Sequence, residues 1–384
     1  MISLLVGVML VGGWPEAGLP LGTNPRIAWA GCTWVEREQE SSHFETALHR
    51  LRPGSRITVR NLGWSGDTVF GEARAGFGSV EDGYKALITQ VRDVKPTVIL
   101  LSYGFNESFE GPKGLPAFKA QYNRLLRDLK PLGAAIFLTG VPPAIDHPPE
   151  LVAAGPLNAN GQLYTQAIQE VAKDQGVGFI GVDALRPAQA DLSSNGIHLR
   201  PGGYKALAGS WLSALGYADQ AKPFKATIDA ANRQADGAVI DEFTANASGG
   251  WDFTLRAGLL PLAAQPSGVI AIGQLREGDW ELREGDKVVG KGTAAEWGKG
   301  CAVTLPGDVE RAEKLRKEVA RKNREFFYRW RPQNETYLFG FRKHEQGQNA
   351  REIPQFDPII EEAEKRMAAL SQPEAHKLTL VPAR

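Results

Sequence analysis

The sequence has 384 residues, with 44 basic and 44 acidic side chains and therefore a formal net charge of zero. This balance gives no electrostatic reason to expect binding to nucleic acid or to an anionic membrane surface. The two cysteines, Cys32 and Cys301, supply no disulfide framework, and the sequence contains no CxxC or HExxH pattern for a metal ion. We therefore expect neither a metal nor another cofactor.

The first 20 residues begin with the apolar stretch 1–13 and continue with small residues. About a dozen apolar residues are too few to span a bilayer. Their number matches the apolar core of a signal peptide, although no Lys or Arg precedes them. We expect residues 1–20 to be a signal peptide and the protein to be exported, periplasmic or extracellular. The alternative is a buried first strand in a cytoplasmic protein.

From residue 26 to about 215, short apolar runs alternate with amphipathic segments. The runs are 27–30, 57–59, 98–101, 135–138 and 178–182. Each is short and continuous rather than alternating, which is typical of strands buried on both faces. The segments with helical spacing are 43–51, 82–91, 118–129, 164–172 and 204–215. This alternation predicts a three-layer α/β/α, flavodoxin-like domain over residues 24–218, built on a parallel sheet.

The pattern changes after residue 216. Residues 219–305 contain period-two stretches and turn signals, such as 275–282 followed by Glu284-Gly285-Asp286, which predict hairpins in a small antiparallel β-rich module. We expect residues 306–384 to form a helical, aromatic C-terminal extension. In it, a charged helix begins at Val309, an aromatic block follows at 326–332, and a last helix covers about 358–370.

Four loops carry the side chains that could act in catalysis or binding. Three lie at the expected carboxyl ends of strands, where ligands of doubly wound sheets bind, and the fourth lies just before the last helix of the domain. They contain Gly31-Cys32-Thr33, the segment 61–68 with Gly66, the segment 103–107 with Asn106, and Asn195-Gly196-Ile197-His198. In chain order these segments resemble the four sequence blocks of the SGNH hydrolases, also called GDSL-like lipases and acylhydrolases. The resemblance covers about residues 26–215.

The resemblance implies a site for ester hydrolysis. By its motifs, Thr33 is the nucleophile and His198 the general base, and the oxyanion hole consists of the Thr33 N–H, the Gly66 N–H and the Asn106 side chain. These residue types suit the chemistry, because ester hydrolysis needs a hydroxyl activated by a base. It also needs fixed donors where the carbonyl oxygen becomes negative, each worth about 3–4 kcal/mol.

Three residues depart from the family pattern. Cys32 and Asn195 stand where the family has aspartate, and Thr33 stands where it has serine. The threonine methyl group restricts χ1 and crowds the path of attack. Loss of the carboxylate behind a catalytic histidine lowers turnover by about 10⁴-fold in serine proteases, although an asparagine can still orient the ring. We assign Asn195 a weak orienting role, with Asp191 or Glu36 as alternative carboxylates.

Each candidate residue also has a purely structural interpretation. Thr33 could cap the following helix, Gly66 could be a turn glycine, and Asn106 could hold its own loop. His198 could be a structural hydrogen-bonding histidine. Cys32 is expected to be a small buried hydrophobe, with a thiol nucleophile as the alternative.

The tail suggests a further set of substrate contacts. A tail of this kind follows the hydrolase domain in bacterial proteins of the same divergent GDSL-like branch. Its polar side chains alternate with aromatic ones and could line a pocket for a hydroxylated ligand. Arg342, His344 and Glu345 are the residues that we expect to reach the site. The alternative is that the aromatic rings pack the tail and the charges are solvated.

Together the residues predict a hydrolase of oxygen esters. Acetyl or acyl esters on carbohydrates are the expected substrates, by analogy with the family. Because two members of the triad are replaced, a second hypothesis is an SGNH-fold protein that has lost catalysis and binds a glycan or a protein partner. An acyl transferase, which shares the acyl-enzyme step, is a third. The sequence makes no prediction of the oligomeric state.

Overall fold

The computed structural model describes residues 22–145, 154–182, 185, 190–215, 217, 222–229, 233–261 and 266–383. The chain forms two compact units. The first consists of Met1–Ser41 and Thr58–Ala218, and the second of Ser42–Ile57 and Asp219–Arg384. The predicted signal peptide, residues 1–20, lies outside the described residues. Among the described helices, none has both the length and the apolar composition that crossing a membrane requires.

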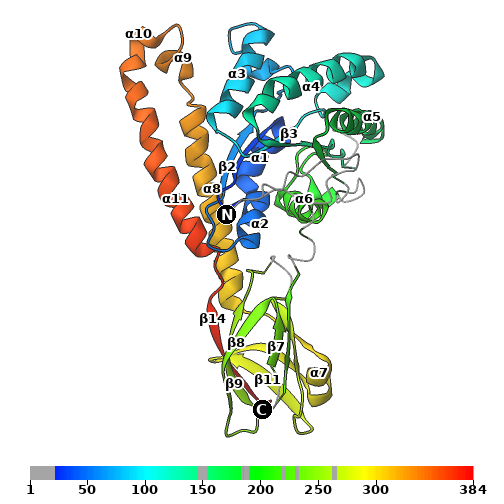
Figure 1. Ribbon diagram of the computed structural model, residues 1–384, viewed down its shortest axis with the longest axis vertical. Helices are drawn as coiled ribbons and strands as arrows, with labels where there is room; N and C mark the ends of the chain where they lie inside the picture. The colour runs from blue at the N-terminus through cyan, green and yellow to red at the C-terminus, as the bar shows by residue number, and fades with distance from the viewer. Residues whose placement is uncertain are drawn as a thin grey trace, which may run out of the picture. The chain divides into compact units, whose positions relative to one another are not determined.

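The first unit is built on a five-stranded parallel sheet with the order β2-β1-β3-β4-β5 (Figure 1). Its strands are β1 (Arg26–Gly31), β2 (Thr58–Gly63), β3 (Val98–Ser102), β4 (Ala135–Thr139) and β5 (Gly178–Ile180). Each overlaps one of the apolar runs, so the predicted parallel α/β sheet is confirmed. The strand order changes direction between β1 and β3, and ligands of doubly wound sheets bind at the carboxyl ends beside such a point.

Helices cover this sheet. They are α1 (Thr33–Ser41), α3 (Val80–Asp93), α4 (Leu115–Leu129), α5 (Ala154–Gln175) and α6 (Pro201–Ala214). α4 packs between α3 and α5 (Figure 1). Its apolar residues at helical spacing are all buried: Phe118, Tyr122, Leu125, Leu126 and Leu129. α3 begins with a capping box, in which the side chains of Ser79 and Asp82 accept each other's backbone N–H.

α1 is not among the segments with helical spacing, and only the interpretation of Thr33 as a helix cap implied a helix at this place. It begins directly after β1 and is largely charged, but it buries Trp34 and Val35. The rings of Trp29, Trp34 and Trp211 contact one another, with centroids 5.3 to 5.7 Å apart. These aromatic contacts fix α1 and α6 against β1, and aromatic pairs of this kind stabilise packing beyond the area they bury.

The second unit contains a β-sandwich. One sheet has the order β13-β10-β6-β7 and the other the order β12-β11-β14-β9-β8. The strands of the first are β6 (Phe224–Ile228), β7 (Arg233–Asp236), β10 (Gly268–Ile272) and β13 (Cys301–Val303). Those of the second are β8 (Ala238–Ala245), β9 (Trp251–Ala257), β11 (Asp279–Glu284), β12 (Lys287–Thr293) and β14 (Ala375–Pro382). Both sheets bury side chains in one shared core, which includes Ile270, Trp280 and Trp297.

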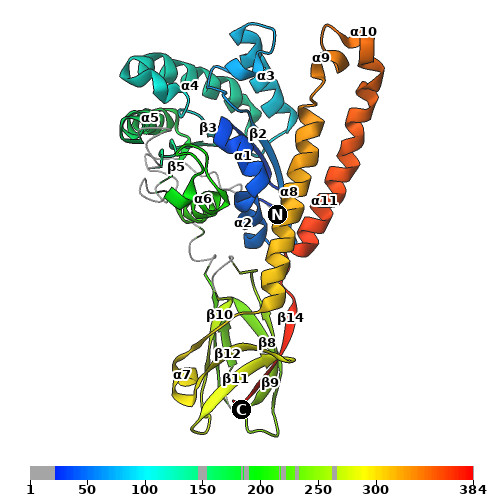
Figure 2. The ribbon, with the colours of Figure 1, turned by 180° about the vertical axis from the view of Figure 1, so that it is seen from behind.

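The sandwich differs from the expected antiparallel module in one pairing. β6 and β10 are parallel, because the chain between them passes through β8 and β9 of the other sheet. The predicted hairpin is present as β11 and β12, with Gly285 at a φ of +57° in the turn. The short helix α7 (Ala294–Lys299) packs beside β10 and β12 (Figure 2).

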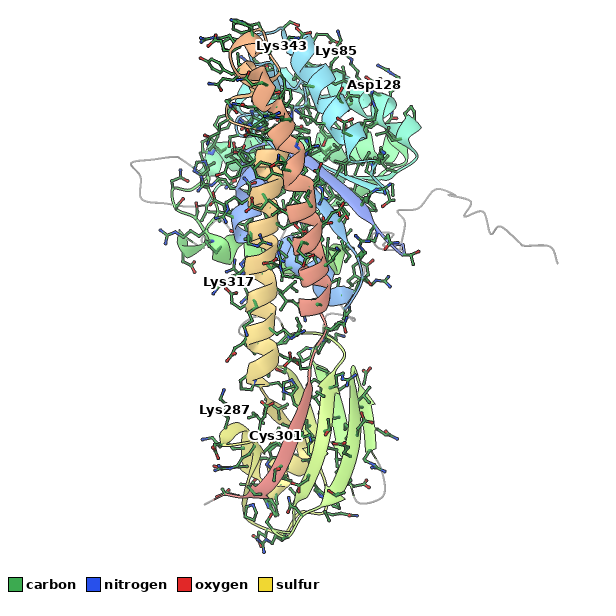
Figure 3. All side chains as sticks on the ribbon, turned by 90° about the vertical axis from the view of Figure 1, so that its left-hand side faces the viewer. Lys85, Asp128, Lys287, Cys301, Lys317 and Lys343 are labelled. Carbon is green, nitrogen blue, oxygen red and sulfur yellow. The ribbon has the colours of Figure 1, made fainter. Side chains whose placement is uncertain are left out.

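The tail forms two long helices, α8 (Pro306–Trp330) and α11 (Phe356–Leu370), joined through the short helices α9 (Glu335–Leu338) and α10 (Lys343–Gln346). α8 and α11 lie side by side (Figure 3) and bury Leu315, Val319 and Met367 between them. After α11 the chain returns as β14, which pairs with both β9 and β11.

α2 (His43–Leu51) belongs to the second unit, although it follows α1 in the chain. It packs against α8, where the Lys322 ammonium lies 2.7 Å from the Glu45 carboxylate, with both side chains buried. Two segments therefore lie apart from the ranges that their sequence positions suggest: α2 is grouped with the tail, and β14 with the strands of the sandwich.

Candidate active site

The four predicted catalytic and oxyanion-hole residues lie in the loops and at a helix start of the first unit. Thr33 is the first residue of α1, two residues after the end of β1, and Gly66 lies in the loop after β2. Asn106 follows β3, and His198 precedes α6. Each is partly or fully exposed, as contact with a substrate requires. Parallel strands bring the first three loops to one edge of the sheet.

Thr33 and Gly66 are in direct contact. The Gly66 N–H donates to the Thr33 hydroxyl, with the nitrogen and oxygen 3.0 Å apart. A Cβ at Gly66 would meet no heavy atom within 4 Å, whereas its φ of +77° is in the left-handed region. Glycine is thus required here by the backbone conformation rather than by a lack of space.

Asn106 contacts the same loop from β3. Its Nδ2 donates to the carbonyl oxygen of Asp67, at 2.6 Å. The Asp67 carboxylate forms a buried ion pair with Arg74 at 2.6 Å and also accepts from the Tyr103 hydroxyl. Since an asparagine amide has two N–H donors, the contact with Asp67 orients the Asn106 side chain and leaves its second donor for a ligand.

Glu107 is a supporting residue that sequence reasoning missed. Its carboxylate accepts from the Val69 N–H at 2.7 Å and from the Gly104 N–H at 2.8 Å, so it joins the loops after β2 and β3. Burial raises the pKa of Glu107 to about 7, although these N–H donors lower it. A carboxylate directly after Asn106, in the loop that follows a fully buried strand, was the available signal.

His198 is held by Asn195. The Nδ2 of Asn195 lies 3.2 Å from the His198 Nδ1, while its Oδ1 accepts from the N–H groups of Ile197 and His198. Burial lowers the pKa of His198, and the positive charge of Arg37 on α1 lowers it further. The ring is therefore neutral at pH 7 and lies near α1, the helix that begins with Thr33.

The hydrogen bonds of residues 22–145 and 190–215 connect Thr33 with Gly66 and Asn195 with His198, but they do not join Thr33 to His198. α6, which follows His198, is attached to α1 by the bond from the Tyr204 hydroxyl to the Trp34 carbonyl oxygen. Two carboxylates were the alternatives to Asn195 as the partner of His198. Of these, Glu36 accepts from the Ser65 N–H, and Asp191 is exposed.

Cys32 has no environment for a thiolate. It is fully buried, and its burial and the nearby Glu107 carboxylate raise the pKa of the thiol. Because the thiolate is the nucleophilic form of cysteine, the alternative of a thiol nucleophile is not supported. Cys32 instead packs as the small buried hydrophobe that its position after β1 suggested.

The three tail residues lie in and beside α10. Arg342 pairs with Glu345 and also donates to the Tyr337 hydroxyl, and His344 is largely exposed. Their contact with a substrate stays a prediction. Within the part of the chain that the structure describes, no three His, Cys, Asp or Glu side chains are grouped as metal ligands would be.

Comparisons with known proteins bear on this site. Residues 29–206 match the model of the GDSL-like Lipase/Acylhydrolase family. A gut microbial diltiazem-metabolizing enzyme shares the fold over 96% of this chain and 100% of its own, with 15% identity and a TM-score of 0.73. No curated protein sequence matches this chain.

Two further solved structures align with about half of the chain. An acetylxylan esterase from Geobacillus stearothermophilus covers 51% of it and 96% of its own length, with 19% identity and a TM-score of 0.40. An α/β hydrolase from the metagenome of Lake Arreo, Spain, covers 52% and 99%, with 18% identity and a TM-score of 0.40. The diltiazem-metabolizing enzyme shows that the architecture of nearly the whole chain recurs in another protein.

Proposed function

Since residues 29–206 belong to the GDSL-like lipase/acylhydrolase family, we propose that this protein hydrolyses carboxylic esters with Thr33 as the nucleophile and His198 as the general base. The family match supports an ester hydrolase in general. The roles of the individual residues follow their motif positions, and the contact between Thr33 and Gly66 supports two of them.

The contact between Thr33 and Gly66 is the observation that carries this proposal. The Gly66 N–H lies 3.0 Å from the Thr33 hydroxyl oxygen. When the Thr33 oxygen attacks the acyl carbon of an ester, the carbonyl oxygen of that ester lies next to the Thr33 oxygen and within reach of the same N–H. A nucleophile and an oxyanion donor must both lie about 3 Å from one reacting position, and the 3.0 Å contact between these two groups supports such an arrangement. The second Asn106 amide hydrogen and the Thr33 N–H complete the proposed oxyanion hole.

In the proposed reaction, the Thr33 oxygen forms a bond to the acyl carbon while its proton passes to His198 Nε2. The ester alcohol leaves with that proton. Water then gives a proton to His198 and its oxygen bonds to the acyl carbon. The bond from that carbon to the Thr33 oxygen breaks, His198 returns the proton to Thr33, and the acid is released. Glu107 takes no proton in these steps, since it holds the loops that position Gly66 and Asn106.

Acetyl or acyl esters of carbohydrates are the proposed substrates. Trp64 lies two residues before Gly66 and is partly exposed, and the Arg74 guanidinium lies 5.4 Å from its ring centroid. A partly exposed aromatic ring two residues from Gly66 offers a face on which a hydroxylated ring could stack. The choice of carbohydrates otherwise rests on analogy within the family.

Hydrolysis of p-nitrophenyl acetate tests the assignment. We expect the parent protein to hydrolyse this ester, and Thr33→Ala and His198→Ala each to reduce kcat/KM by at least about 100-fold, because each removes a group that the acyl transfer needs. Thr227→Ala, a change on the exposed face of β6, is the matched control and should retain the parent activity. Equal activity in the parent and in both site variants would refute the proposed roles.

One observation favours the second hypothesis, a protein that binds glycans without cleaving them. The group beside His198 Nδ1 is an amide rather than a carboxylate. In this case an acetylated glycan would bind, measured by calorimetry, without release of acetate, and Thr33→Ala would bind it equally well. Acetate release from the same glycan by the parent protein would exclude this hypothesis.

A further inference from the structure

The orientation of the Asn195 amide is fixed by the backbone. The N–H groups of Ile197 and His198 lie 3.1 and 2.8 Å from one end of the amide. A backbone N–H can only donate, so the atom that faces both must be the oxygen, Oδ1. The other end, which lies 3.2 Å from His198 Nδ1, is therefore the NH₂ group.

This orientation determines where the neutral imidazole carries its proton. An amide NH₂ has no lone pair to accept a hydrogen bond, so it can only donate to Nδ1. Nδ1 must then be unprotonated, and the ring proton resides on Nε2. A histidine that takes the proton of Thr33 needs the reverse arrangement, with a proton on Nδ1 and a free lone pair on Nε2.

We propose that Asn195 is a positioning residue that holds His198 in the Nε2–H tautomer, in which Nε2 already carries a proton and cannot accept that of Thr33. The consequence of this inference, a slowed esterase, rests on the proposed function. Hydrolysis then proceeds through the minor Nδ1–H tautomer, in which Nδ1–H and the amide NH₂ oppose each other as two donors.

The surrounding loop prevents the amide from turning over. The Ser194 N–H donates to the His198 carbonyl oxygen at 2.9 Å, and the Gly196 N–H donates to the Ser193 hydroxyl at 2.9 Å. Gly196 has a φ of +88°, in the left-handed region, which permits this tight turn. A turned amide would place its NH₂ against two backbone N–H donors and lose both hydrogen bonds, which is costly for partly buried groups.

Asn195→Asp is the substitution that changes the tautomer of His198 and keeps the other hydrogen bonds of the loop. A carboxylate is close in shape to the amide, and one oxygen can still accept from the N–H groups of Ile197 and His198. The other oxygen would accept from Nδ1–H and reverse the tautomer. Since the opposite change lowers turnover by about 10⁴-fold in serine proteases, we expect Asn195→Asp to raise kcat/KM for p-nitrophenyl acetate by about 10²–10⁴-fold.

Nitrogen-15 NMR of the histidine rings tests the tautomer without reference to activity. The chain has six histidines, and loss of one set of signals in His198→Ala assigns the ring in question. We expect a protonated Nε2 and an unprotonated Nδ1 in the parent protein at pH 8, and the reverse in Asn195→Asp. A protonated Nδ1 in the parent protein would overturn the inference, whatever the activity.

The pH profile gives a second readout that a purely structural role would not change. A carboxylate beside Nδ1 favours the imidazolium, so the acidic limb of kcat/KM should move to higher pH in Asn195→Asp. Asn123→Asp is the matched control, because it adds the same charge in α4 and can still accept from Gln175. Neither the tautomer nor the pH profile should change in this control.

The outcomes distinguish the inference from the proposed function. Peptide mass spectrometry first establishes that residue 195 of the parent protein is asparagine and has not been converted to aspartate. A reversed tautomer together with a faster reaction that Thr33→Ala abolishes supports both. A reversed tautomer with no ester hydrolysis in either protein supports the role of Asn195 and contradicts the assignment of His198 as the base. An unchanged tautomer in Asn195→Asp overturns the inference.

Discussion

At the scale of single residues, the site that we propose in the first unit combines groups suited to acyl transfer with a threonine and an asparagine that we expect to slow the reaction. Thr33 carries a hydroxyl against the Gly66 N–H, and Glu107 holds the two loops from which Gly66 and Asn106 come. Asn195 instead fixes the neighbouring histidine as a donor. In the proposed reaction, the oxyanion donors are thus arranged for catalysis, whereas Asn195, the residue behind the proposed base, is not.

Thr33→Ser tests the cost of the threonine methyl group. Serine keeps the hydroxyl that accepts from Gly66 but regains freedom about χ1 and opens the path of attack. We expect kcat/KM for p-nitrophenyl acetate to rise about tenfold, equivalent to about 1.4 kcal/mol in the barrier. Thr227→Ser serves as the control. A fall in activity with an unchanged melting temperature would show that the methyl group positions the nucleophile.

At the scale of secondary-structure elements, one buried histidine connects three parts of the second unit. His376 on β14 lies 2.7 Å from Glu284 on β11 through Nδ1 and 3.3 Å from Asp308 on α8 through Nε2. Burial alone would lower the pKa of His376, but the neighbouring carboxylates of Asp308 and Glu284 raise it to about 9. The imidazolium therefore stabilises the contact of β14 with its neighbours.

The stability of this unit should consequently depend on pH. A histidine whose pKa is higher in the folded than in the unfolded chain stabilises the fold fully below about pH 6.5. That contribution is lost as the pH rises to about 9. We expect the free energy of unfolding in urea, followed by tryptophan fluorescence, to fall by roughly 2–3 kcal/mol over this range. His376→Gln should be less stable at pH 6 and show a smaller fall. An equal fall in both proteins would assign the pH dependence to other groups.

At the scale of the whole chain, the predictable features were those that arise from local patterns. Short continuous apolar runs gave all five strands of the parallel sheet, and the chemistry of such sheets directed attention to the loops of Thr33, Gly66 and Asn106. α1 was missed because its charged sequence has no apolar periodicity, and its burial depends on two tryptophans, Trp34 and, far along the chain, Trp211.

Long-range contacts account for the other differences. β14 pairs with β9, more than 100 residues earlier in the chain, and no local pattern specifies such a partner. α2 packs on α8 through a buried Lys322–Glu45 pair, and a lysine in a charged helix gives no sequence signal of burial. The orientation of the Asn195 amide likewise depends on backbone N–H directions that only the folded loop defines.

Covalent labelling tests the central claim, that Thr33 is an activated nucleophile, most directly. An alkyl fluorophosphonate reacts with a hydroxyl that a neighbouring base activates, and the adduct is located by peptide mass spectrometry. We predict an adduct on Thr33 after prolonged incubation of the parent protein, faster labelling in Asn195→Asp, and no labelling of this peptide in Thr33→Ala. An adduct located on another residue, and retained in Thr33→Ala, would contradict the account.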